Sequence, residues 1–235
     1  MTRQRVLVPE WLDALAADDP RAIRSRRDLR RINRLMAAQP VLARSLDALL
    51  GSARGTHLVE LGAGDGSLAL RLAQRLSRPW PRMTLDLLDL QPCISAATLA
   101  GLRATGWEVR VIQADVLDWL AQPSGNAARA VVFANLFVHH FEGQRLQRLL
   151  AGIAARAHGF VCLEPRRSAT GLFGSRLLGV IGCNDVTRHD AVASVRAGFA
   201  GRELSAGWPD ADAWSLREGA AGLFGHRFEA VRALS

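Results

Sequence analysis

The chain contains no lysine and no tyrosine, so all 30 of its basic residues are arginine. These absences exclude a Schiff base on a lysine amine and a tyrosine that acts as a general acid. No run of about 18 uninterrupted apolar residues occurs, which argues against a membrane-spanning helix. The three cysteines are an odd number without metal-ligand spacing, so we expect a reducing, cytoplasmic environment, no disulfide framework and no metal site.

The residues that are present suit one large folded domain, which we expect to span residues 1–235. Hydrophobic residues make up 49% of the chain, enough for a buried core and too many for a disordered protein. The first ten residues hold too few apolar side chains for a signal peptide. The net charge of +8 suits nucleic acid, an acidic membrane or an anionic small molecule, or simply reflects a genome that encodes every cation as arginine.

Short apolar strands alternate with helical segments through the middle of the chain, which is the pattern of βαβ units in a parallel sheet. The predicted strands are 57–61, 84–89, 108–112, 130–134 and 160–164, and the predicted helices between them are 68–76, 94–104, 116–121 and 142–157. The expected fold is therefore α/β, with a Rossmann-like and mostly parallel sheet.

The flanking segments complete this expected organisation. An N-terminal helical cap (1–50) comprises helices at 9–17 and 21–50, the latter interrupted near Pro40, and precedes a nucleoside-binding core (51–165). A helical insertion with several glycines follows as a flap over the substrate (166–205), and a closing antiparallel hairpin (206–235) uses strands 214–217 and 226–232. Turn-forming residues also predict a loop at 123–126.

The first predicted strand runs directly into three closely spaced glycines, Gly62, Gly64 and Gly66. Glycines at such a strand end let bare backbone and a helix N-terminus approach a ligand, and a nucleoside cofactor is the natural occupant. An ordinary tight turn is the alternative. A dinucleotide fingerprint requires glycine or alanine three residues after Gly64, and Ser67 stands there instead.

Polar residues stand at the C-terminal ends of the next predicted strands, and parallel sheets of this class bind ligands at that edge. Asp89 is placed to accept hydrogen bonds from both hydroxyls of a ribose, unless it is merely a solvated carboxylate. Asp115 suits either an adenine amino group or the N-cap of the following helix, and both roles can coexist. Asn135 ends the fourth strand.

This series resembles the class I S-adenosylmethionine (SAM) methyltransferases, whose first motif, E-x-G-x-G-x-G, is matched from Glu60 to Gly66. The resemblance implies SAM as cofactor and a sulfonium beside Asn135. The implied cofactor-binding residues are Glu60, Gly62, Ala63, Gly64, Gly66, Asp89, Leu90, Asp115, Val116 and Asn135. Segments 28–34 and 187–205 are also similar to a bacterial subgroup associated with type III polyketide synthases, which implies O-methylation of a phenolic polyketide.

Three histidines are the candidate catalytic residues for a hydroxyl acceptor, which has to lose a proton. His139 and His140 follow the fourth strand, and His189 lies in the predicted flap. An imidazole that titrates near neutrality can take that proton, although each of these rings can also simply pack or cap a helix. Glu164, at the end of the fifth strand, looks like an acid that lines the acceptor cavity in small-molecule methyltransferases.

The identity of the partner is the least constrained feature. The segment after Asn135 lacks both the N-P-P-[FY] motif of adenine methyltransferases and the Pro-Cys nucleophile of cytosine enzymes, so a small-molecule acceptor is preferred to nucleic acid. Seven arginines between Arg21 and Arg34 form either a solvated helix face or a phosphate-binding surface, which keeps an RNA methyltransferase as an alternative. A non-catalytic SAM-binding module is a second alternative, and a homodimer is compatible with the sequence.

Overall fold

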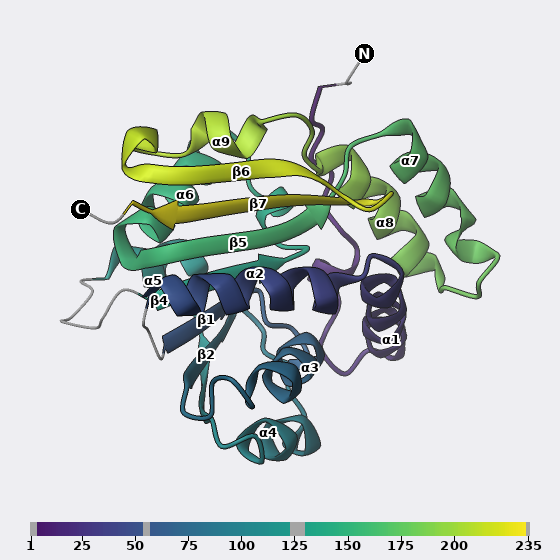
Figure 1. Ribbon diagram of the computed structural model, residues 1–235. Helices are drawn as coiled ribbons and strands as arrows, with labels where there is room; N and C mark the ends of the chain where they lie inside the picture. Colours follow the sequence, from purple (N-terminus) through teal and green to yellow (C-terminus); the bar gives the residue numbers. More distant parts are fainter. Residues whose placement is uncertain (1–3, 54–56, 123–129, 234–235) are drawn as a thin grey trace.

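The computed structural model describes residues 4–53, 57–122 and 130–233 (Figure 1), so the loop expected at 123–126 lies outside the described residues. A seven-stranded sheet with the order β3-β2-β1-β4-β5-β7-β6 forms its centre. The first five strands are parallel, and β7 pairs antiparallel with both β5 and β6. The strands are β1 (His57–Leu61), β2 (Thr84–Asp89), β3 (Glu108–Gln113), β4 (Ala130–Asn135), β5 (Ala157–Pro165), β6 (Trp214–Ala221) and β7 (Gly225–Arg232). The mostly parallel sheet with a closing hairpin is confirmed.

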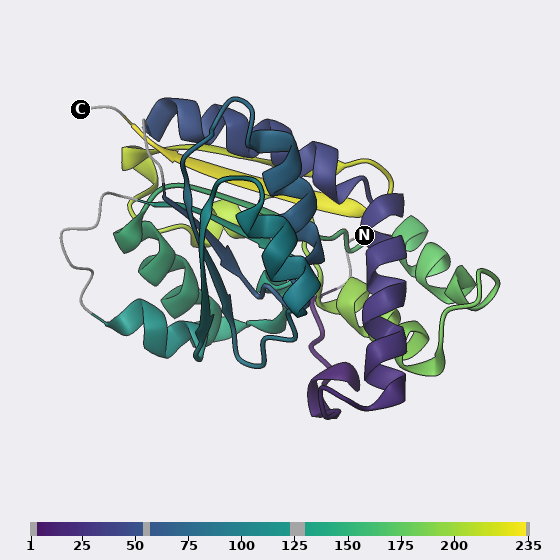
Figure 2. The same ribbon diagram turned by 90° about the horizontal axis from the view of Figure 1, so that it is seen from below.

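Helices cover both faces of this sheet, as Figures 1 and 2 show. The α-helices are α1 (Pro20–Leu35), α2 (Ala38–Ala53), α3 (Ser67–Leu76), α4 (Ala96–Arg103), α5 (Val116–Ala121), α6 (Gly143–Arg156), α7 (Ala169–Arg176), α8 (Asp185–Ala197) and α9 (Glu203–Gly207). Short 3-10 helices occupy Leu12–Ala14, Val138–His140, Leu177–Gly179 and Ala211–Ala213. None of the helices in the described ranges combines the length and apolar character needed to cross a bilayer.

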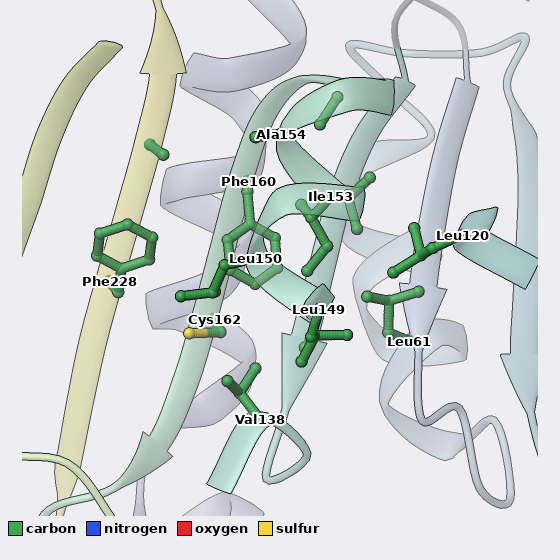
Figure 3. Packing of buried hydrophobic residues seen from close by; sticks show 14 of the residues in the cluster. Leu61, Leu120, Val138, Leu149, Leu150, Ile153, Ala154, Phe160, Cys162 and Phe228 are labelled. Carbon is green, nitrogen blue, oxygen red and sulfur yellow. The ribbon is translucent and has the colours of Figure 1, made fainter. Parts of the chain in front are cut away.

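Two separate apolar clusters fill the space between the sheet and its helices. One packs α5, α6 and α9 against one face, and the other packs α2, α3 and α4 against the opposite face. The first contains Phe160 and Phe228 from neighbouring strands, together with Leu149 and Ile153 of α6 (Figure 3). Since β4 and β5 are covered on both faces, they are buried almost throughout and mostly apolar, without the alternation of a half-exposed strand.

The N-terminal helix α1 and the insertion helix α8 lie side by side at the carboxyl ends of the parallel strands (Figure 2). Their contact is partly polar. Asp28 accepts a hydrogen bond from the backbone N–H of Asn184 at 2.9 Å, and the hydroxyl of Thr187 lies 3.0 Å from that of Ser25. Leu35, at the end of α1, is 62% exposed.

The helix expected at 9–17 is wrong, because only Leu12–Ala14 form a single 3-10 turn there. Tertiary contacts hold the surrounding backbone instead. The carboxylate of Asp190 accepts the N–H groups of Trp11 and Leu12 at 2.8 and 3.0 Å, and the Trp11 ring stacks on His189 at 4.0 Å. These contacts bind the N-terminal segment (residues 4–19) to α8.

Two predicted boundaries also shift. The break in the long N-terminal helix falls at Ala37, whose φ of 52° is left-handed, and not at Pro40. Pro40 lies in the first turn of α2, where a missing N–H costs no helical hydrogen bond. Strand β5 begins at Ala157, three residues earlier than expected, because α6 ends at Arg156.

Candidate functional site

The chain passes from β1 to α3 through a glycine loop (residues 62–66) that is fastened to β2. The N–H of Gly62 donates to the carbonyl of Leu88 at 2.9 Å. The carboxylate of Asp89 accepts the N–H of Gly64 at 2.8 Å and the N–H of Gln91 at 2.8 Å. Asp89 therefore holds the shape of the loop, whatever else it binds.

The three loop glycines have positive φ angles of 73°, 55° and 68°, but their surroundings differ. A Cβ on Gly62 would overlap the ring of Phe137, 2.8 Å from its Cγ, and a Cβ on Gly66 would lie 3.2 Å from Ile94 and Thr98. A Cβ on Gly64 would meet no described atom within 4 Å. Gly62 and Gly66 thus serve packing, whereas Gly64 presents its backbone to open space.

Glu60 is a buried carboxylate without a partner at this loop. It is 2% exposed, and within the described part of the chain its Oε2 atom has no hydrogen bond. Burial raises the pKa of Glu60 well above its usual range, and the nearby carboxylates Asp65 and Asp89 raise it further. A buried acceptor of this kind normally has a donor, so the site suits a cationic or hydrogen-bonding ligand.

A polar cavity of about 160 Å³ opens in front of the glycine loop. Its walls come from the loop itself, from Glu60, from the end of β4 and from one face of α1. The α1 residues are Arg26, Leu29 and Asn33. The side-chain amide of Asn135 donates to Asn33 Oδ1 at 2.9 Å, and its own buried Oδ1 has no partner among the described residues.

A second, apolar cavity of about 270 Å³ adjoins the polar one. The two share Leu12, Leu29 and Leu136, so they lie next to each other, one more polar and one apolar, with these three side chains between them. Helices α1, α7 and α8 supply most of the apolar wall. Its polar margin comprises Glu10, Ser25, Ser175, Thr187, Asp190 and Ser194.

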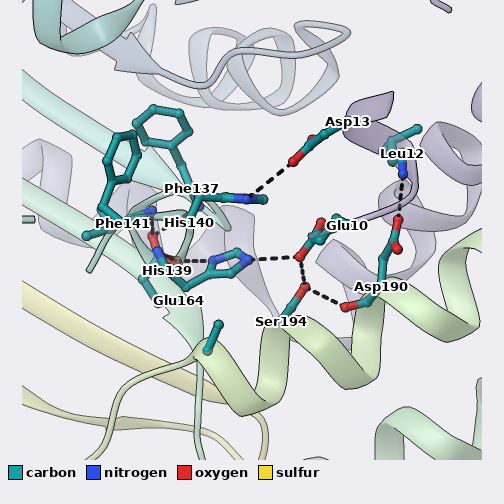
Figure 4. Close-up of polar contacts among 12 residues, drawn as sticks. Glu10, Leu12, Asp13, Phe137, His139, His140, Phe141, Glu164, Asp190 and Ser194 are labelled. Carbon is teal, nitrogen blue, oxygen red and sulfur yellow. Dashed lines mark hydrogen bonds and ion pairs between the residues drawn. The ribbon is translucent and has the colours of Figure 1, made fainter. Parts of the chain in front are cut away.

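His139 lies between two carboxylates (Figure 4). Its Nδ1 is 2.7 Å from Glu164 and its Nε2 is 3.3 Å from Glu10, while Glu164 also accepts the N–H of Val138 at 2.9 Å. Burial alone would lower the pKa of His139, but the hydrogen bonds to the two carboxylates outweigh it and raise the pKa to about 9. In this arrangement both ring nitrogens carry protons near neutrality, which leaves no lone pair to accept another.

The other two candidate histidines have different surroundings. His140 is partly exposed and lies 3.6 Å from Asp13. Burial lowers the pKa of His140, and the positive charge of His139 lowers it further. His189 faces Asp190 at 2.9 Å and stacks on Trp11, so its ring fastens the N-terminal segment and does not line either cavity.

Solved methyltransferases share this arrangement of strands and helices over most of the chain. The mitomycin 7-O-methyltransferase MmcR superposes with a TM-score of 0.55 at 19% identity, covering 94% of this chain and 60% of that one. The methyltransferase domain of the bacterial protein CtHen1-C gives 0.54 at 13% identity, covering 85% and 100%. The chain has the fold of a class I methyltransferase.

The sequence of the central part of the chain agrees with this fold. Residues 58–157 match the family described as "Methyltransferase domain". Ribosomal RNA small subunit methyltransferase A of Acidithiobacillus ferrooxidans is 36% identical over 107 residues, which cover 43% of this chain and 36% of that protein. The chain thus matches only about a third of the length of these curated relatives.

The fold brings five of the ten predicted cofactor residues to one cavity, and Asp89 is not among the residues that line it. Glu60, Asn135 and the glycine loop line it, apart from Gly66, whose neighbours are the side chains of Ile94 and Thr98. Further along the same sheet edge, Leu90 is 61% exposed, and Val116 is buried. Asp115 caps α5 by accepting the N–H of Leu117 at 2.7 Å, which was one of its two expected roles.

The residues that sequence reasoning missed come mainly from the N-terminal part of the chain. Glu10, Leu12, Leu29 and Asn33 line the cavities, yet they lie far in sequence from the glycine motif. On α1 a signal was available, because Arg26, Leu29 and Asn33 are spaced i, i+3 and i+7 and share one helix face. Glu10 and Leu12 belong to irregular backbone, for which no sequence periodicity exists.

Asp89→Ala is expected to weaken SAM binding by about 1 to 2 kcal/mol, because it removes a charged hydrogen-bond acceptor and loosens the glycine loop. Calorimetric titration with SAM measures the effect. Asp118→Ala, on the exposed side of α5, is the matched control and should bind like the unaltered protein. Equal SAM affinity in Asp89→Ala and the control would contradict the ribose assignment.

Proposed function

We propose that this protein is a SAM-dependent methyltransferase that methylates an oxygen atom of an apolar small molecule, most specifically a phenolic hydroxyl of a polyketide-type compound. The observation that carries this proposal is the pair of adjoining cavities. The polar one is built around the glycine loop and an unpartnered buried carboxylate, and the apolar one begins where the polar one ends. Cofactor and acceptor would meet at the shared residues Leu12, Leu29 and Leu136.

The residues present fit SAM. Glu60 can accept a hydrogen bond from an ammonium group, and the unpartnered Oδ1 of Asn135 is a second buried acceptor in the same cavity. Bare backbone at Gly64 allows close approach, and Asp89 retains acceptor capacity for ribose hydroxyls. When bound, SAM supplies an electrophilic methyl group on a sulfonium. The chain's contribution is to bind, align and exclude water.

The acceptor is inferred from the apolar cavity. Its wall is mainly leucine, isoleucine, valine and glycine, with a minority of oxygen-bearing side chains. A ring or alkyl chain with few polar groups fits such a wall, and the margin formed by Glu10 and Ser194 suits its hydroxyl. We assign the receipt of the hydroxyl proton to Glu10 or His140 beside that margin, because both ring nitrogens of His139 already carry protons. The structural similarity to a protein named as an O-methyltransferase supports the same class.

An RNA methyltransferase is the second candidate, because the curated relatives act, by name, on ribosomal RNA. The arginines of α1 would then contact phosphates. However, Arg30 forms an ion pair with Asp65 at 2.7 Å and Arg31 pairs with Asp28 at 3.3 Å, so part of this surface is used within the chain. The apolar cavity also offers little to a nucleotide, which needs hydrogen bonds or aromatic stacking.

Ala191→Phe is expected to abolish methylation of apolar phenols while leaving SAM binding unchanged, because the new ring fills the apolar cavity beyond the cofactor end. Transfer of labelled methyl groups to a phenol panel and to total RNA measures acceptor use, and calorimetry measures SAM binding. Arg196→Phe, on the exposed side of the same helix, is the control. Label that enters only RNA, with a steep loss of binding in salt, would favour the RNA candidate instead.

A further inference from the structure

One cluster of polar side chains at the edge of the apolar cavity has the composition of a metal site. Glu10, His139 and His140 each offer a ligand atom, and these atoms lie within 4.8 Å of one another. Two imidazoles with a carboxylate are the ligand set that zinc and similar divalent transition metals prefer. No cysteine or metal-binding spacing in the sequence indicates this set, since Glu10 lies 129 residues from His139.

The geometry around His139 is that of a metal ligand held by a second carboxylate. Glu164 contacts Nδ1 at 2.7 Å and also accepts the backbone N–H groups of Phe137, Val138 and His139 at 3.2, 2.9 and 3.3 Å. These bonds fix the orientation of both Glu164 and the imidazole, and they direct Nε2 toward Glu10. A carboxylate behind a histidine is the usual support of a metal-ligating ring, because it fixes the tautomer and makes the free nitrogen a better ligand.

The distance between His139 and Glu10 is the distance expected for two ligands of one metal ion. His139 Nε2 and Glu10 Oε1 are 3.3 Å apart, longer than the 2.7 Å on the Glu164 side. Two ligands that bind one tetrahedral zinc ion at its usual bond lengths are separated by about 3.3 Å. Binding would replace the proton between these two atoms and would release it to solvent.

The charge of the cluster also favours a cation. Three carboxylates lie beside the two imidazoles: Glu10, Asp13 and Glu164. Arg5 is close in space, but its guanidinium donates to the backbone carbonyls of His139 and Phe141 at 3.2 and 3.0 Å. The carboxylates therefore outnumber the positive groups that contact them, and a divalent ion would balance the excess (Figure 4).

We propose that Glu10, His139 and His140 bind a divalent transition-metal ion of the zinc type at the margin of the apolar cavity. Three protein ligands leave a coordination position open, which is the pattern of catalytic rather than structural zinc sites. Glu10 itself lines the cavity, so, given the proposed function, the open position would take the acceptor oxygen and lower the pKa of its hydroxyl, whose proton would then leave to solvent and not to the three ligating side chains. The site would join the N-terminal segment to the 3-10 helix that follows β4.

The test is direct metal binding by the full chain after dialysis against a chelator. Calorimetry with Zn²⁺ and absorption spectroscopy with Co²⁺ are expected to show one ion per chain, and Zn²⁺ should raise the melting temperature. His140→Gln and Glu10→Gln should each lower the affinity at least tenfold. His57→Gln, which alters a histidine that faces a carboxylate at the other end of the sheet, is the matched control and should bind normally.

The outcomes separate this inference from the proposed function. No binding of either ion, or equal binding by His140→Gln, Glu10→Gln and His57→Gln, would overturn the metal site. A drop in melting temperature of Glu10→Gln without any effect of Zn²⁺ on the unaltered protein would likewise assign the cluster to a purely structural ion pair. Binding of the demethylated cofactor S-adenosylhomocysteine is measured separately, so its absence would count against the methyltransferase proposal alone.

Discussion

Glu60→Gln is expected to weaken SAM binding by about 1.5 to 3 kcal/mol, roughly ten- to a hundredfold. The side chain is 2% exposed, lines the polar cavity and has an Oε2 atom without a partner among the described residues. An ammonium group there gains a charge-assisted hydrogen bond that glutamine supplies only as a neutral one. Calorimetric titration measures the loss. Asp86→Asn, which changes a buried carboxylate that is already paired with His57 and Arg110, is the control for burial alone.

The same substitution should remove a proton that is released when SAM binds. Burial raises the pKa of Glu60, so the free protein holds this proton to higher pH than an exposed glutamate would. A cation beside the carboxylate favours the ionised form, and binding should therefore strengthen as the pH rises toward the raised pKa. Titrations in buffers of different ionisation enthalpy detect the proton. Identical heats in all buffers, or unchanged affinity in Glu60→Gln, would refute this assignment.

The raised pKa also predicts the sign of a stability change. Between the ordinary and the raised pKa, unfolding releases the proton of Glu60, so the free energy of unfolding falls as the pH rises through that window. Glutamine does not titrate. Without SAM, Glu60→Gln should therefore be at least as stable as the unaltered chain near neutrality, in contrast to its weaker binding. Urea denaturation of both proteins at several pH values measures the free energies of unfolding that this prediction compares.

Gly62→Ala is expected to lower the free energy of unfolding by about 2 to 4 kcal/mol, the sum of a left-handed backbone penalty and an overpacked contact. The added Cβ would overlap the ring of Phe137. Gly64→Ala is the matched control, because it has a similar positive φ of 55° and no described atom within 4 Å. It should lose only about 1 kcal/mol.

For SAM affinity the order of the two variants should be reversed, with Gly64→Ala more impaired than Gly62→Ala. The Cβ in Gly64→Ala projects into the open space of the polar cavity, so this variant should fold but bind SAM poorly. Adding Phe137→Leu to Gly62→Ala should restore part of the lost stability, since the smaller side chain relieves the overlap. Equal stability of the two alanine variants would show that the ring of Phe137 does not restrict Gly62.

Local patterns predicted the core of the fold because they act over short distances. Strand β1 occupies the predicted residues 57–61, and β2 occupies 84–89. Alternation of apolar strands with amphipathic helices is sufficient for a parallel sheet, because each strand has to be buried on both faces. The role of the glycines could also be predicted from the sequence, because a left-handed backbone before α3 strongly favours glycine.

Contacts between distant segments explain the expectations that were wrong. The segment 9–17 forms only one 3-10 turn, and its backbone is held by Asp190 of α8, which accepts the N–H groups of Trp11 and Leu12. The α1 face that packs on α8 carries Ser25 and Asp28, whose partners Thr187 and Asn184 belong to the insertion. In both cases the partner lies more than 150 residues away in the sequence.

The sequence by itself determined the sheet, its glycine loop and the acidic residues that end its strands, because each depends on neighbours within one βαβ unit. Only the tertiary structure decided that Oε2 of Glu60 has no partner among the described residues, that α1 lines the polar cavity, and that Glu10 contacts His139. The physical reason is that burial and charge pairing depend on which segments meet in space. Residue type and spacing along the chain do not predict these tertiary contacts when one of the two residues lies in irregular backbone.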